Sequence, residues 1–83
     1  MPTIAIVDGA KIMMYANDHP PVHFHVLFAE HRAVIDVDTL KLIRGQLPSA
    51  KHRAIVKWAA PRRAKLLQAW DTTQAHLLPA RVR

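Results

Sequence analysis

In the stretch Val22-His23-Phe24-His25-Val26-Leu27-Phe28, the first five residues alternate between apolar side chains and histidines. A β-strand points successive side chains to opposite faces, so Phe24 and the valines share one face while His23 and His25 share the other. The two prolines before the run predict an extended turn. The stretch therefore predicts a strand with one buried apolar face and two imidazoles on the opposite face.

Short β-prone runs lie on both sides of this strand and predict an antiparallel meander. Asp8-Gly9 is the strongest short signal for a two-residue hairpin, and it separates the first two runs. Ala29–Arg32 is expected to form a four-residue turn between the third and fourth. The expected strands are Thr3–Val7, Ala10–Ala16, Val22–Phe28, Ala33–Val37 and a short fifth run, Leu40–Arg44.

From Ser49 onward the spacing of apolar residues changes from two to about 3.6, which predicts helices. Ser49 is the expected N-cap of the first helix, Pro61 suits the first position of a second, and Pro79 ends it. Each helix has an apolar stripe that is expected to face the core, and each stripe contains one tryptophan. The stripes consist of Ala54, Ile55, Trp58 and Ala59, and of Leu66, Leu67, Trp70, Leu77 and Leu78.

These elements predict an α+β fold in a single domain, residues 1–83. An antiparallel β-meander of four to five strands occupies residues 1–47, and a basic pair of C-terminal helices, residues 48–79, packs on one face. The absence of cysteine excludes disulfides, thiolate metal sites and cysteine nucleophiles. The chain shows no basic leader and no apolar run near the ~20 residues that span a bilayer, so we expect a soluble cytoplasmic protein that does not enter membranes.

The net charge of +6 is distributed unevenly. Residues 1–47 carry four basic and five acidic side chains, a net charge of −1, whereas residues 48–83 carry eight basic side chains and one acid, a net charge of +7. Such a basic block attracts nucleic acid or an acidic protein, although a solvated helix face has the same composition. The candidate binding residues are Lys51, Arg53, Lys57, Arg62, Arg63 and Lys65.

A second candidate site lies around the histidine strand. If Ala29–Arg32 is a four-residue turn, His25 lies opposite Asp36 and His23 lies opposite Asp38 on one face of the sheet. A register shift of two residues would preserve this shared face. His19, just before the prolines, could fold back toward the pair. Asn17 and Asp18 are expected to bond the backbone of their own turn.

Three interpretations of this group remain open. His19, His23 and His25 could bind a divalent metal, zinc or manganese, with an open position for chemistry. Without a metal, His23 or His25 could act as a general base oriented by Asp36. The candidate catalytic residues are therefore His19, His23, His25 and Asp36. The structural alternative is that cross-strand His–Asp pairs simply stabilise the sheet.

A set of short motifs spread over nearly the whole chain matches one known pattern. The motifs are Met1-Pro2-Thr3-Ile4, Tyr15-x-Asn17-Asp18-His19-Pro20-Pro21-x-His23-x-His25-Val26, Ile35-Asp36, Thr39-Leu40, Gly45, Leu47-Pro48, Trp58 and Leu66-Leu67-x-Ala69-Trp70. In these residues the chain resembles a family of small bacterial proteins classed as a domain of unknown function. The resemblance implies a gene beside another small uncharacterised gene, in a pair of toxin–antitoxin type. Members usually begin the second helix with acidic residues, whereas this chain has Ala59-Ala60-Pro61-Arg62-Arg63.

Two functional hypotheses follow. The first is an interaction module that binds a cognate small protein, with its basic C-terminal helices engaging an acidic protein or nucleic acid; a homodimer is compatible with the sequence. The second is a small hydrolase, most plainly a nuclease, that uses the His/Asp group with or without a divalent metal.

Overall fold

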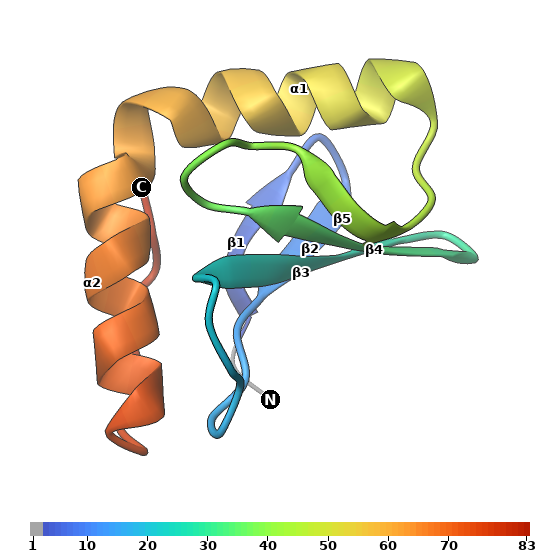
Figure 1. Cartoon of the computed structure of the whole chain (residues 1–83). Helices are drawn as coiled ribbons and strands as arrows, with labels where there is room; N and C mark the ends of the chain where they lie inside the picture. The colour runs from blue at the N-terminus through green and yellow to red at the C-terminus, as the bar shows by residue number, and fades with distance from the viewer. Residues whose placement is uncertain (1–2) are drawn as a thin grey trace.

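The computed structural model describes residues 3–83; Met1 and Pro2, which open the family-like pattern, lie outside the described residues. Five strands form one antiparallel sheet in chain order, and the helices follow them, which confirms the expected α+β meander (Figure 1). The strands are β1 (Thr3–Val7), β2 (Ala10–Met13), β3 (His23–Phe28), β4 (His31–Asp36) and β5 (Leu42–Gly45). The helices are α1 (Ser49–Ala59), the 3-10 turn η1 (Ala60–Arg62) and α2 (Arg63–Gln74).

The core lies between one face of the sheet and the helices. Alternate strand residues such as Ile12, Phe24 and Ile35 are fully buried there, as the period of a strand requires. In Figure 1, α1 runs across the sheet and α2 turns down past the end where β3 begins. Trp70 of α2 is buried, and Trp58 of α1 is half-buried against the same core, so both tryptophans are core residues as predicted.

The two hairpins differ in how well their sequences predicted them. Asp8 and Gly9 form the expected two-residue loop, with φ angles of 49° and 82°. Two consecutive positive φ angles are typical of a type I′ turn, whose twist matches that of the strands. The second loop is also two residues long, Ala29-Glu30, because Phe28 pairs with His31. The four-residue turn predicted for Ala29–Arg32 was therefore wrong.

The shorter loop changes the register of β3 against β4 by two residues. His23 lies opposite Asp36, and His25 lies opposite Val34. The predicted pairs, His25 with Asp36 and His23 with Asp38, were wrong. Because side chains alternate with a period of two, this shift leaves both histidines on the predicted face.

The helix ends also differ from the prediction. Pro48 occupies the N-cap position of α1 without a side-chain hydrogen bond, so Ser49 is the first helical residue rather than the cap. Helix α2 ends at Gln74, well before Pro79. Just after this end, His76 adopts a φ of 62° and donates its N–H to Thr73 O at 2.9 Å. Leu77 N–H donates to Thr72 O at 3.1 Å.

This pair of hydrogen bonds is a Schellman motif, which satisfies the last carbonyls of a helix and terminates it. The chain leaves the helix axis before the last two leucines expected in the α2 stripe. Leu77 and Leu78 are therefore 65% and 86% exposed, and Leu67, earlier in the stripe, is 46% exposed. The predicted place of these three leucines in the core was wrong.

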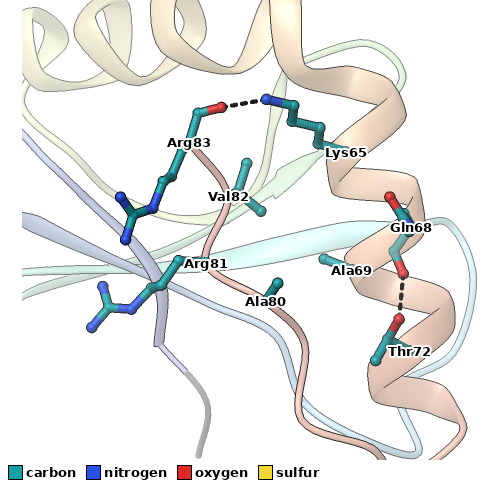
Figure 2. A pocket seen from close by; sticks show the side chains of 8 residues that line it. All are labelled: Lys65, Gln68, Ala69, Thr72, Ala80, Arg81, Val82 and Arg83. Atoms are coloured by element: carbon teal, nitrogen blue, oxygen red, sulfur yellow. Dashed lines mark hydrogen bonds between the residues drawn. The ribbon is translucent and has the colours of Figure 1, made fainter.

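After α2 the chain returns along the helix toward β1. Val82 is only 7% exposed and donates its N–H to Ile4 O at 2.8 Å. Lys65 Nζ donates to Arg83 O at 2.6 Å, so the last residues are held from both sides (Figure 2). This segment connects β1 with α2 and closes the core at that edge.

Within residues 3–83, no helix combines the length and the apolar character that crossing a bilayer requires.

Candidate functional site

The histidine centre consists of Asp18, His23 and His25. Strand β3 points both imidazoles to the side of the sheet opposite the core, and the loop before β3 brings Asp18 back over them. Asp18 Oδ2 lies 3.2 Å from His23 Nε2 and 3.1 Å from His25 Nε2. Asp18 thus contacts the histidines rather than the backbone of its own turn. One carboxylate oxygen bridges two imidazoles on the sheet surface.

Aromatic neighbours hold the two rings in place. The Tyr15 ring meets His25 edge-on with centroids 4.4 Å apart, and the Trp70 ring meets His23 with centroids 5.1 Å apart. Gln74 Nε2 of α2 donates to Tyr15 O at 3.0 Å, which ties the loop to the helix. The side chains of His23 and His25 are only 12% and 28% exposed. The histidine centre is therefore a packed, partly dehydrated group.

The other two residues proposed for this site, Asp36 and His19, are near the histidine centre but are not part of it. Asp36 Oδ1 accepts hydrogen bonds from the N–H groups of Asp38 at 2.7 Å and Thr39 at 3.0 Å, so this carboxylate stabilises the turn after β4. His19 is exposed and lines the same hollow as the histidine centre. The donor atoms of Asp18, His23 and His25 all lie within 4.8 Å of one another, and His19 is not in that group.

Sequence reasoning missed Asp18 as a site residue. It lies five residues before His23, and only the path of the loop decides whether it reaches the strand. The available signal was its place two residues before the proline pair, which predicts a turn just ahead of the strand.

Two hollows adjoin the histidine centre. The first has a volume of about 270 Å³ and is lined by all three members of the centre. The second has a volume of about 440 Å³ and lies over the outer side of β2, β3 and β4. His25, Val34 and Arg44 line both hollows, so the histidine centre opens onto the surface of the sheet.

We call this outer side of the sheet the open face. The first row across four strands runs Ile6, Lys11, Leu27, Arg32, and the next runs Met13, His25, Val34, Arg44. Ile6 is 59% exposed, and Lys11, Arg32 and Arg44 are exposed. Three of the four basic residues in the nearly neutral half of the chain therefore lie on one surface, interleaved with apolar side chains.

Four of the six basic residues proposed for nucleic-acid or acidic-partner binding make contacts within the protein. The contacts are Lys51 with Asp8 Oδ2 at 2.9 Å, Arg62 with Trp58 O at 2.7 Å, Arg63 with Val37 O at 3.3 Å, and Lys65 with Arg83 O at 2.6 Å. Arg53 and Lys57 are exposed on α1. The basic block of the sequence thus divides between side chains that support the fold and side chains that face solvent.

Comparison with known proteins places the chain in a family without an assigned activity. A search of curated proteins and a search of solved structures each returned no match. The family model described as Domain of unknown function (DUF4160) matches residues 9–71, which include β2 to β5, the histidine centre, all of α1 and most of α2. Because this match covers well over half of the chain, the protein belongs to the DUF4160 family of domains of unknown function.

Proposed function

We propose that this protein is an interaction module whose open face binds a small acidic partner protein. The observation that carries this proposal is the first row of that face, where the exposed Ile6 and the half-buried Leu27 alternate with the exposed cations Lys11 and Arg32. Helix α1 covers the opposite face, as Figure 1 shows, and leaves this one accessible within residues 3–83. The resemblance to the family implies the setting, a pair of adjacent genes of toxin–antitoxin type.

The apolar part of the face supports a protein as the partner. Protein interfaces combine a desolvated apolar centre with a polar rim, and arginine is enriched in them. Ile6, Leu27 and Val34 supply apolar surface, while Arg32 and Arg44 flank it. A phosphate backbone would use the cations and leave the apolar side chains exposed to water.

The charge of the face supports an acidic partner. Its three cations are exposed, and the carboxylate of Asp18, on the same side of the sheet, is shared by two histidines. An acidic protein would gain favourable electrostatic energy across the interface and a faster association rate. The helices support nucleic acid less well, because four of their six candidate cations are engaged within the protein.

The test is calorimetric titration of the purified chain with the product of the gene adjacent to its own. We expect a complex in which the double substitution Arg32→Glu/Arg44→Glu raises Kd by at least about tenfold, because like charges would then meet across the interface. The matched control, Arg53→Glu/Lys57→Glu, makes the same charge change at two exposed side chains of α1 and should alter Kd by less than about threefold.

Three outcomes would overturn the proposal. One is the absence of a complex with the adjacent gene product. Another is a larger effect of the α1 substitutions than of the open-face substitutions. The third is binding of a duplex oligonucleotide instead, with an affinity that falls steeply with salt concentration and is lost in the α1 variant.

A further inference from the structure

We propose that Asp18, His23 and His25 form a binding site for a divalent transition metal, with zinc preferred. This inference concerns a different ligand from the partner protein and does not depend on that proposal. Two imidazole nitrogens and one carboxylate oxygen are the donor set that zinc accepts in proteins. The hydrogen bonding of His23, the spacing of the donor atoms and the residues packed around them all favour such a site.

The hydrogen bonding of His23 identifies which of its nitrogens is free. His23 Nδ1 lies 2.7 Å from Pro21 O, and a carbonyl oxygen can only accept, so Nδ1 carries the proton. In the neutral ring, Nε2 then presents a lone pair. That lone pair points at Asp18 Oδ2, which is 3.2 Å away and also an acceptor. Two acceptors at this distance repel unless a proton or a metal ion lies between them.

The spacing of the donor atoms suits a metal. Zinc–nitrogen and zinc–oxygen bonds of about 2.0–2.1 Å in a tetrahedron separate neighbouring ligand atoms by about 3.3 Å. The distances from Asp18 Oδ2 to the two Nε2 atoms, 3.2 Å and 3.1 Å, lie within a few tenths of an ångström of that value. The donor atoms of all three residues also lie within 4.8 Å of one another, so one metal ion could contact all of them after side-chain adjustment.

The surroundings provide the support that metal ligands usually have. A ligating histidine commonly donates its second ring N–H to a backbone carbonyl, which fixes its tautomer and orientation, and Pro21 O accepts in this way from His23. Tyr15 and Trp70 pack against the two imidazoles and restrict their rotation. Three protein ligands beside a hollow of about 270 Å³ leave a fourth position open to water or a small ligand.

The test is calorimetric titration of the chain, freed of any histidine tag and stripped with a chelator, with Zn²⁺ and separately with Mn²⁺. We expect one zinc per chain and weaker binding of manganese, which prefers oxygen ligands. Asp18→Asn should weaken zinc binding by about 100-fold or more, because the charged ligand is lost. The variant should fold, because its amide N–H₂ group can donate to the imidazole nitrogens.

The matched control is Glu30→Gln, which makes the same carboxylate-to-amide change beside a surface histidine, His31, 3.4 Å away. It should leave zinc affinity unchanged. His25→Gln is a second variant that should lose zinc binding if Asp18→Asn proves unstable. Failure of the wild-type chain to bind zinc, with a proton alone bridging Asp18 and His23, would overturn the proposal. Equal losses in the Asp18 and Glu30 variants would do so too, because zinc would then bind surface histidines nonspecifically.

Discussion

Gly45, the last residue of β5, shows how one side chain can be excluded by the backbone around it. Its φ is 82°, a conformation that L-residues rarely adopt. A Cβ at this position would lie 2.0 Å from Arg32 O and 2.9 Å from Ala33 Cα, both backbone atoms of the neighbouring strand. Gln46 N–H donates to the same Arg32 O at 3.1 Å, so that carbonyl cannot move away without losing a bond. Glycine is required here by space as well as by dihedral angle.

At the residue scale we therefore predict that Gly45→Ala lowers the free energy of unfolding by more than about 2 kcal/mol, as measured by chemical denaturation. Gly9→Ala is the control, because Gly9 has the same φ of 82° but its added Cβ would meet only Phe28 Cε1, at 3.9 Å. That variant should lose only about 1 kcal/mol, from dihedral strain alone. Equal losses in the two variants would contradict the steric argument.

At the element scale, the hairpin of β3 and β4 determines the geometry of the histidine centre. In its two-residue loop, Ala29 has a positive φ of 52°, whereas the φ of Glu30 is not positive. A positive φ at the first loop position alone is typical of a type II′ turn, where glycine is preferred. The loop holds the register in which His23 faces Asp36 and His25 faces Val34. Its sequence is thus compatible with the turn without being optimal for it.

We predict that Ala29→Gly stabilises the protein by about 0.5–1 kcal/mol, because relief of the left-handed strain exceeds the added entropy of the unfolded chain. Thermal or denaturant unfolding would measure the gain. Glu30→Gly should have the opposite sign and lose about 0.5–1 kcal/mol, since only the entropic effect operates there. Stabilisation by both substitutions would indicate a different turn.

At the scale of the whole molecule, the last residues join parts that are distant in the sequence. Val82 packs in the core and bonds Ile4 of β1, while Lys65 of α2 bonds Arg83 O (Figure 2). The segment thereby fills the edge of the core that the strands and helices leave open. A buried valine contributes through the apolar surface that it removes from water and through close packing.

Val82→Ala should accordingly lower the free energy of unfolding by about 1–2 kcal/mol, measured by denaturant titration of the full chain. Leu78→Ala removes a larger side chain from the same segment, but Leu78 is 86% exposed. Its effect should stay within about 0.5 kcal/mol. A larger loss from Leu78→Ala than from Val82→Ala would show that the segment packs differently.

The elements of the fold were largely predictable because their signals are local. Alternation with period two identified the strands, Asp8-Gly9 identified the first hairpin, and Pro61 marked the break between the helices, although it lies in η1 rather than at the start of α2. The limits of the elements were less predictable. The end of α2 at Gln74 depends on a Schellman motif built on a histidine, whereas its usual signal is a glycine.

The sequence by itself determined that His23 and His25 share one face, because a strand alternates its side chains whatever its register. Only the tertiary structure decided which carboxylate meets them. A loop of two residues rather than four moved Asp36 opposite His23, where it stabilises its own turn, and the preceding loop brought Asp18 to both imidazoles. The same limit applies to Lys51, Arg63 and Lys65, whose intramolecular partners lie 43, 26 and 18 residues away in the sequence. Periodicity follows from local backbone geometry, whereas these contacts join segments whose separation is set only when the whole chain has folded.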